Sequence, residues 1–516
     1  MPAIKKTPIA YFTEAPAVLE ALQQLADKYD EPGSSHNYKK LVISDTLDGE
    51  GYQYVNLVQE GGGVLGIALV GYTYILEKAG IRFMRLAGTS AGAINTTLLA
   101  VVKEDKANKR TSSERILEYL CEKPFFDFVD GHPFAQRLIK WVVKTEHFAK
   151  RIKRCGLWLG IILTLLILLD ITSFGLLFHD PMFEGVAITS FILTGIVLMA
   201  LGFVGGYFGY LIQRLKNRGF GINPGKNFTD WIKMIMEKNG VNNIDDLEAV
   251  SEKIPAGLQL RPDVPIDKNL GDNPLKGLKP DITLITSDII TQNKIEFPRM
   301  WNLFRENKHE IHPAEFVRAS MSIPIFFESH IIRDIPRHLP IIQTNWRNHL
   351  LLEPQDIPTA VRFVDGGILS NFPINVLYNP EVTIPRLPTL GIELDDSTPT
   401  DNTMNQADNL SLGAYIGKLF NTVRYYYDKD FLLKNSLFRK GIGVIKVSDY
   451  NWLDFNIPEE KQRELFVLGA QAAAKFLLED FNWEEYKTAR IIVHQQVNTS
   501  RKDMRGASEL LTQSRK

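Results

Sequence analysis

Cysteine and net charge are both scarce in this chain of 516 residues. The chain has two cysteines, Cys121 and Cys155, which excludes a disulfide framework or a cysteine-based metal site and is typical of a reducing compartment. A formal net charge of -1 argues against a protein that holds nucleic acid through phosphate contacts. The first residues, MPAIKKTPIAYF, lack the continuous apolar core of a secretory signal. We therefore expect neither a metal nor a nucleic-acid partner.

Two long apolar runs stand in the middle of the chain, at residues 155–178 and 185–212. Each exceeds the roughly 20 residues that a helix needs to cross a bilayer, and Asp170 is the one charge within them. The segment HDPMFE between them has no Lys or Arg, whereas basic residues flank the pair on both outer sides. Because basic flanks stay cytoplasmic, the pattern predicts a two-span transmembrane hairpin with both ends in the cytoplasm. A buried core hairpin or an apolar lid of a soluble enzyme is the alternative.

The rest of the sequence alternates between strand and helix patterns. Residues 52–58 and 81–88 have strand character, and a helix pattern that ends at Gly80 lies between them. Strand patterns resume in three later segments, at residues 282–291, 360–365 and 389–394. Linked crossover units of this kind predict an α/β fold with a mainly parallel central sheet, into which the hairpin is inserted.

The segment RLAGTSAGAINTTLLA, which begins at Arg85, places one serine between two glycines. The turn contains Gly88, Ser90 and Gly92, and it joins the second strand to a helical stretch. A strand, a tight Gly-x-Ser-x-Gly turn and a helix form a nucleophile elbow, which raises a serine hydroxyl above the sheet at a helix N-terminus. A capped helix whose glycines only make the turn is the simpler alternative. Ser90 is thus a candidate nucleophile.

A glycine loop follows the first strand and contains Gly61, Gly62, Gly63 and, after two residues, Gly66. One interpretation is a dinucleotide-binding loop, which requires an acidic residue at the end of the next strand. The serine turn occupies that place. The second interpretation, an oxyanion hole of backbone N–H groups, is therefore favoured.

Asp365 ends the strand at residues 360–365 and is followed by Gly366 and Gly367. A serine hydroxyl is a poor nucleophile without a base, and a carboxylate on a tight turn at the same sheet edge can act as that base. Most Asp-Gly-Gly sequences are only turns, and the spacing from Ser90 carries no geometric information. Asp365 becomes a candidate because the glycine loop and the serine turn accompany it.

The motifs EGGGVLG, GTSAG and DGG, in this order, resemble those of the patatin-like phospholipases, which are lipid acyl hydrolases with a Ser-Asp dyad. The segments SDIITQNKIEF, VRASMSIPIFF and DGGILSNFPI agree, so the resemblance covers residues 50–100 and 280–395. It implies a three-layer α/β/α fold, with Ser90 as nucleophile and Asp365 as base. It also implies oxyanion N–H groups at Gly61, Gly62 and Gly63, a membrane lipid substrate, and neither a metal nor an organic cofactor.

Leu65 departs from the family pattern, because the family often carries Arg or Lys two residues after the third glycine. A cation there would contact a phospholipid headgroup or brace the oxyanion. Its absence brings lysophospholipid and neutral lipid into consideration beside phospholipid. Two other interpretations stay open: a Ser-His-Asp esterase that uses His494, which follows a strand-like run, and a catalytically inactive membrane-tethered lipid-binding scaffold.

The sequence thus predicts an integral membrane lipid acyl hydrolase whose catalytic domain is cytoplasmic, and it does not indicate an oligomeric state. The expected parts are an N-terminal extension (1–50), a first core block (51–150), the hairpin (151–218), a helical and loop connector (219–280), a second core block (281–395), a C-terminal helical region (396–498) and a flexible tail (499–516).

Overall fold

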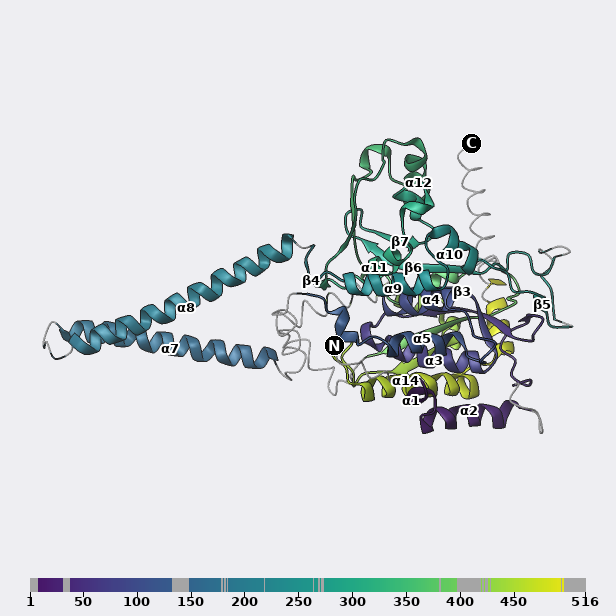
Figure 1. The fold of residues 1–516 in the computed structure, drawn as a ribbon, viewed down its shortest axis with the longest axis horizontal. Coiled ribbons are helices and arrows are strands. Elements are labelled where there is room, and N and C mark those ends of the chain that lie inside the picture. The colour runs from purple at the N-terminus through teal and green to yellow at the C-terminus, as the bar shows by residue number, and fades with distance from the viewer. Residues whose placement is uncertain are drawn as a thin grey trace, which may run out of the picture. The chain divides into compact units, whose positions relative to one another are not determined.

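The computed structural model describes most of the chain and divides it into two compact units. The smaller unit is Asp130–Pro224 with Ile325–Glu328, and the larger unit is the remainder (Figure 1). The expected tail and part of the basic segment before the hairpin lie outside the described residues. The described residues are 8–30, 38–131, 148–177, 184–217, 219–262, 273–379, 382–396 and 428–492, with short pieces between and after them.

The larger unit is built on a ten-stranded mixed sheet whose central strands are parallel. Five strands run parallel in the order β12, β11, β2, β3 and β6, while β7 and β10 pair antiparallel with β6, and β9 pairs antiparallel with β10. Short β1 and β5 extend the sheet beside β2. The strands are β1 Thr46–Leu47, β2 Gln53–Gln59, β3 Ile81–Thr89, β5 Gln259–Leu260, β6 Asp281–Asp288, β7 Asn293–Phe297, β9 His330–Ile332, β10 Val361–Asp365, β11 Thr389–Asp395 and β12 Ile442–Lys446.

Helices follow the strands as the alternating pattern predicts. Polar caps fix two of the helix starts: Thr111 and Glu114 form a reciprocal capping box at α5, and Asn243 caps α10. The helices of this unit are α1 Ala10–Thr13, α2 Pro16–Tyr29, α3 Gly66–Lys78, α4 Ala91–Val101, α5 Ser112–Cys121, α9 Lys226–Lys238, α10 Ile244–Ser251, α11 Ala314–Ser320, α12 Pro340–Leu350 and α14 Glu459–Lys475.

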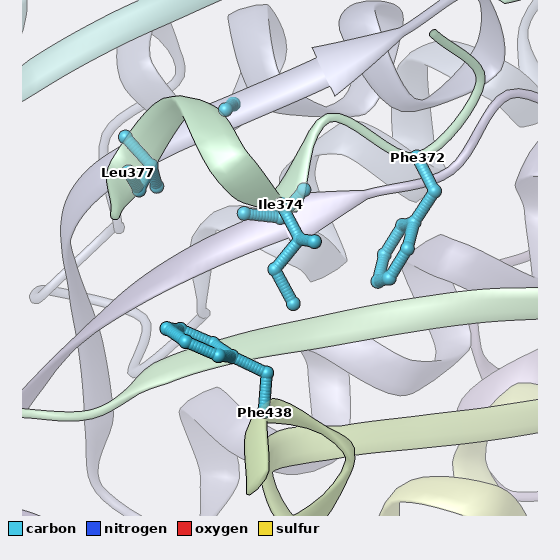
Figure 2. Packing of buried hydrophobic residues seen from close by; sticks show 6 residues of the cluster. Phe372, Ile374, Leu377 and Phe438 are labelled. Atoms are coloured by element: carbon cyan, nitrogen blue, oxygen red, sulfur yellow. The ribbon is translucent and has the colours of Figure 1, made fainter. Parts of the chain in front are cut away.

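The two faces of the sheet carry different covers, because successive side chains of a strand point to opposite faces. Gln59 of β2 hydrogen-bonds with Asn95 and Thr96 of α4, so α4 lies on one face. The preceding Val58 packs on the other face against the short 3-10 helix η9 (Ile374–Leu377) and against Phe438. Figure 2 shows this cluster. Burial of each large apolar side chain contributes about 1.5–3 kcal/mol, which fastens the segment after Asp365 to the sheet.

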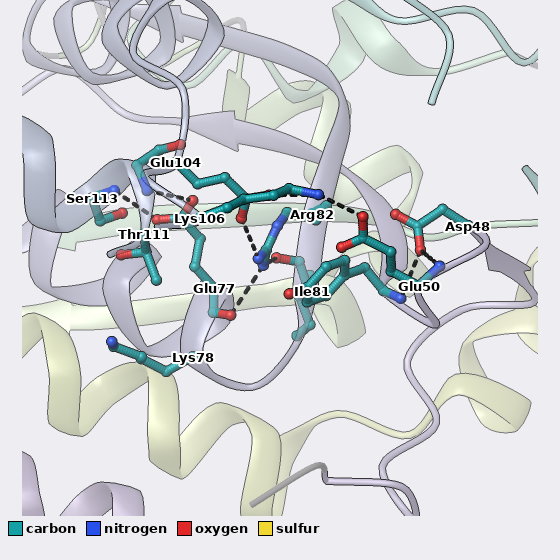
Figure 3. A network of polar contacts seen from close by, with 12 residues as sticks. Asp48, Glu50, Glu77, Lys78, Ile81, Arg82, Glu104, Lys106, Thr111 and Ser113 are labelled. Atoms are coloured by element: carbon teal, nitrogen blue, oxygen red, sulfur yellow. Dashed lines mark hydrogen bonds and ion pairs between the residues drawn. The ribbon is translucent and has the colours of Figure 1, made fainter. Parts of the chain in front are cut away.

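A polar network lies at the amino-terminal end of β3 (Figure 3). Glu77 is buried and accepts hydrogen bonds from the backbone N–H groups of Ser112 and Ser113 at the start of α5. Burial raises the pKa of Glu77. Arg82 donates to the Glu77 carbonyl and pairs with Glu104 at 2.8 Å. Ligands of open α/β sheets bind at the carboxyl ends of the strands, whereas this network lies at the opposite end. We therefore assign it a structural role, in which it holds α3, β3 and α5 together.

The smaller unit contains the predicted helical hairpin. Its helices are α7 (Phe148–Leu177) and α8 (Glu184–Asn217), which pack against each other, and β4 (Gly221–Asn223) pairs with β8 (Ile325–Phe327). Gly156–Leu176 and Glu184–Tyr207 are long and apolar enough to cross a membrane by length and composition alone.

The seam between α7 and α8 is polar. Ser173, Ser190 and Thr194 are buried along it, and Thr194 Oγ1 donates to Asp170 Oδ2 at 2.6 Å. Most large apolar side chains described in the hairpin are exposed instead, Leu165 and Phe191 among them, although Leu166 is buried. The single charge within the apolar runs thus faces the partner helix, where a hydroxyl group offsets part of its desolvation.

Candidate active site

The serine turn joins β3 to α4 through the single residue Ser90. Ser90 follows β3 directly, precedes α4 and has φ 52°, a value that is rare for a residue other than glycine. A Cβ on Gly88 would lie 2.4 Å from the backbone of Gly92, and a Cβ on Gly92 would lie 2.2 Å from the Gln59 carbonyl oxygen. Both glycines are therefore required by close backbone approach, and the predicted elbow geometry is present.

Ser320, the last residue of α11, braces this turn. Its Oγ accepts a hydrogen bond from the Ser90 backbone N–H at 3.0 Å and donates to the Ile285 carbonyl at 2.5 Å. The side chain is fully buried. These two hydrogen bonds hold the serine turn against β6. In the sequence, Ser320 is marked only as part of the segment VRASMSIPIFF.

The pairing of β10 with β6 brings Asp365 next to the end of β3, which Ser90 follows. Residues 281–285 of β6 pair with β3 and residues 286–288 pair with β10, while β7 pairs with residues 284–288. Because a strand has only two edges, β7 occupies one edge and β3 and β10 share the other. Since β10 runs antiparallel, the two strands approach each other end to end. Thr89 pairs with Ile285 and Asp365 pairs with Thr286, so the strand ends meet at adjacent positions of β6.

Ser90 and Asp365 line the same small cavity, of about 40 Å³, together with Gly62, Gly63 and Trp452. Both side chains are buried, and Asp365 Oδ1 accepts the Gly367 N–H at 2.8 Å, which orients the carboxylate. A Cβ on Gly366 would lie 2.2 Å from the Ile285 carbonyl oxygen, so the turn packs directly on β6. Among the described residues, His494 does not line this cavity, and residues 483–492 before it are helical rather than the expected strand.

The glycine loop lies beside the serine turn, and its amides differ in their partners. The Gly61 N–H donates to the Asn371 carbonyl at 3.0 Å, and the Val64 N–H donates to the Trp452 carbonyl at 3.1 Å. Gly63 has φ 55° and leaves no room for a Cβ beside Trp452. Within the described chain, no hydrogen bond is made by the N–H groups of Gly62 and Gly63.

The two residues that follow complete the start of α3. Leu65, which stands where the family often has a cation, is buried. A Cβ on Gly66 would lie 3.0 Å from the Cβ of Ala91, so glycine lets α3 approach α4 next to the serine turn.

Asn371 links the glycine loop to the turn after Asp365. Its Nδ2 donates to Glu60 Oε1 at 2.8 Å and to the Gly61 carbonyl at 3.1 Å. Its Oδ1 fills the space that a Cβ on Gly61 or Gly367 would need. Sequence reasoning missed this role; the available signal was a polar residue within the apolar stretch DGGILSNFPI.

Asp428 supports the same segment from a distant part of the sequence. Its carboxylate accepts hydrogen bonds from Ser370 Oγ at 2.8 Å and from the Phe372 N–H at 2.9 Å. Burial raises the pKa of Asp428 from 3.8 to about 6, partly offset by these bonds. No motif marked this aspartate in the sequence.

Ser90 also lines a second cavity, which is almost entirely apolar. Its volume is about 80 Å³. Ser90, Gly63 and Ala91 line it at the elbow, and aliphatic side chains of α3 and α4 form walls. An aromatic group from η2 (Phe125–Phe128) and α9 also lines it: Phe125, Phe128, Phe228 and Trp231. Ser90 therefore lines both the apolar cavity and the cavity that Asp365 lines.

A buried serine on a strained strand-to-helix turn, next to a carboxylate and a glycine loop, defines the class of α/β esterases. Comparison with known proteins gives the family. A family model described as patatin-like phospholipase matches residues 57–378, and the chain belongs to that family, which indicates lipid hydrolase activity. The resemblance predicted from the motifs is thereby confirmed.

Two individual proteins are similar to this chain. The uncharacterized protein YqhO of Bacillus subtilis (strain 168) is 24% identical over 427 residues, which cover 82% of this chain and 98% of YqhO. The crystal structure of VipD from Legionella pneumophila matches with 14% identity and a TM-score of 0.32, over 89% of this chain and 73% of VipD.

Proposed function

We propose that this protein is a membrane-anchored lipid acyl hydrolase in which Ser90 is the nucleophile and Asp365 the base. The observation that carries the proposal is the shared cavity of Ser90, Asp365, Gly62 and Gly63. Family membership supports a lipid substrate. Leu65 is buried and uncharged, so this position offers no cation to a phospholipid headgroup. The proposed substrates therefore include lysophospholipid and neutral lipid as well as phospholipid.

In the first half of the reaction, Ser90 Oγ attacks the acyl carbonyl carbon while Asp365 accepts the hydroxyl proton. The negative charge on the carbonyl oxygen is stabilised by the N–H groups of Gly62 and Gly63. We assign Gly61 to holding the loop, because its N–H is engaged by Asn371. The tetrahedral intermediate collapses, the alcohol leaves with the proton from Asp365, and an acyl-enzyme remains.

In the second half, water gives a proton to Asp365 and attacks the acyl carbonyl. Collapse of this second intermediate releases the carboxylic acid, and Ser90 regains its proton. No metal or organic cofactor takes part in this scheme.

We further propose that α7 and α8 span a bilayer and that the catalytic unit is cytoplasmic. A polar seam that faces inward and apolar side chains that are exposed suit a lipid environment. Ser90 precedes the hairpin and Asp365 follows it, yet both belong to the larger unit. The two residues must therefore lie on the same side of the bilayer, and two spans return the chain to its starting side. The basic flanks of the hairpin favour the cytoplasm as that side.

The test uses the full chain in detergent with p-nitrophenyl butyrate and a fluorophosphonate probe. Ser90→Ala should abolish hydrolysis and labelling, while Ser251→Ala, at the end of α10, should match the wild type. Undiminished labelling of Ser90→Ala would refute the nucleophile. A wild type that binds lipid vesicles but hydrolyses no ester would favour the inactive scaffold.

The base is tested separately. Asp365→Asn keeps the size of the side chain but removes the proton acceptor, so turnover should fall at least 100-fold. His494→Ala should retain wild-type turnover. A loss in His494→Ala equal to that in Asp365→Asn would establish the Ser-His-Asp alternative instead.

A further inference from the structure

Glu60, the residue before the glycine loop, holds a buried carboxylate between two donors. Its Oε2 accepts the Leu394 N–H of β11 at 2.7 Å, and its Oε1 accepts the side-chain amide of Asn371 at 2.8 Å. Glu60 is 5% exposed and Asn371 is 2% exposed. Hydrogen bonds to a charged acceptor are roughly twice as strong as those between neutral groups, so Glu60 holds the Asn371 amide in one orientation.

Asn371 in turn binds both backbone groups of Gly61. The Gly61 N–H donates to the Asn371 carbonyl at 3.0 Å, and Asn371 Nδ2 donates to the Gly61 carbonyl at 3.1 Å. A Cβ on Gly61 would lie 2.6 Å from Asn371 Oδ1 and 3.1 Å from the Cβ of Ser90. The first residue of the glycine loop is therefore packed between Asn371 and the serine turn.

The bond to the Gly61 carbonyl also orients the amide that follows it. The Gly61 C=O and the Gly62 N–H belong to one planar trans peptide group, in which they point in opposite directions. Because Asn371 holds the carbonyl, the Gly62 N–H points away from Asn371. This N–H makes no hydrogen bond within the described chain, and Gly62 lines the cavity that Ser90 and Asp365 line.

Asn371 also lies against the turn that carries Asp365. A Cβ on Gly367 would lie 2.5 Å from Asn371 Oδ1 and 2.9 Å from Asp365 Oδ1, which accepts the Gly367 N–H at 2.8 Å. The carbonyl of the neighbouring Ser370 accepts Thr89 Oγ1 at 2.9 Å, at the end of β3. One short segment thus contacts the glycine loop, the serine turn and the turn of Asp365.

We infer that Asn371, oriented by Glu60, is a positioning residue that aims the Gly62 N–H at the oxygen of the acyl carbonyl. This inference rests on the proposed function, since it takes Ser90 as the nucleophile. Removal of one oxyanion-hole donor lowers kcat about 100- to 1000-fold. Asn371→Ala keeps the donor but frees its peptide group, so kcat should fall at least tenfold while KM changes little.

The experiment compares p-nitrophenyl butyrate with p-nitrophenyl thionobutyrate, in which C=S replaces C=O, using the full chain in detergent. Sulfur is a weak hydrogen-bond acceptor, so a correctly aimed N–H favours the oxygen ester. Asn371→Ala should lower the ratio of kcat/KM for the oxygen ester to that for the thiono ester at least tenfold. Asn223→Ala is the matched control, because Asn223 is fully buried and binds backbone groups of Gly131 and Phe326 within the smaller unit. It should keep the wild-type ratio.

Glu60→Gln keeps the test decisive if Asn371→Ala is poorly folded. The glutamine side chain has the same size but only one acceptor oxygen, so either Asn371 or Leu394 loses its partner, and the ratio should fall in the same direction. An unchanged ratio in folded Asn371→Ala and Glu60→Gln would overturn the inference, and inactive Ser90→Ala would leave the proposed function standing. Hydrolysis by Ser90→Ala at the wild-type rate would instead refute the proposed function.

Discussion

The replacement of Ser320 by alanine is the strongest test of how the elbow is held. The change removes the acceptor of the Ser90 N–H bond, at 3.0 Å, in a fully buried position. A buried donor left without a partner costs about 1–3 kcal/mol. We therefore expect the free energy of unfolding to fall by that amount and the melting temperature to fall by a few degrees.

We expect Ser320→Ala to lose more catalytic activity than its lower stability alone would cause. Ser90 has a strained φ of 52°, and the bond to Ser320 holds it there. A nucleophile displaced by about 1 Å loses about 100-fold in rate. The assay compares the rate of fluorophosphonate labelling and kcat for p-nitrophenyl butyrate, at a temperature where both proteins are folded.

Thr344→Ala is the matched control, because Thr344 makes an exposed hydrogen bond to Pro340 within α12. It should change neither stability nor labelling. Wild-type labelling in folded Ser320→Ala would refute the idea that Ser320 positions the nucleophile, whatever its effect on melting.

Two further predictions follow from other parts of the chain. Because burial raises the pKa of Asp428 from 3.8 to about 6, the folded state binds a proton more tightly than the unfolded state. Stability should therefore fall as pH rises from about 3 to 7, by about 3 kcal/mol relative to Asp428→Asn; denaturant titrations at several pH values measure this, and parallel pH profiles of the two proteins would contradict it. The hairpin should keep the enzyme in the membrane through high-salt and alkaline washes, because salt screens charge but does not weaken apolar burial. Release by salt alone, followed on immunoblots of membrane fractions, would reduce the hairpin to a peripheral anchor.

The parts of the site that depend on neighbouring residues could be predicted from the sequence. The glycine at 88 marks the serine turn, since the backbone of Gly92, a few residues further on, leaves no room for a Cβ there. The end of β10 at Asp365 was also predictable from its strand pattern and the glycines after it.

The parts that depend on distant contacts could not be predicted. The antiparallel approach of β10 along β6 depends on pairing between segments far apart in the chain, which periodicity does not encode. Ser320, Asn371 and Asp428 each make two hydrogen bonds to other segments, at least one of them to a backbone group. A serine, an asparagine or an aspartate that makes such a bond has the same local sequence signature as one on the surface.

Because β3 and β10 pair with the same edge of β6, the register of these two pairings sets the separation of Ser90 and Asp365 along that strand. Along a strand, each residue advances the chain by about 3.3 Å, and side-chain direction alternates. A two-residue slip of either β3 or β10 would thus move the nucleophile and the base apart or together by about 7 Å, while every apolar side chain still faced its proper side. The distance between Ser90 and Asp365 is consequently independent of what the chain contains between residues 90 and 281. The chain can therefore hold an entire helical hairpin in that interval, or another segment in its place, without a change in the separation of the two residues.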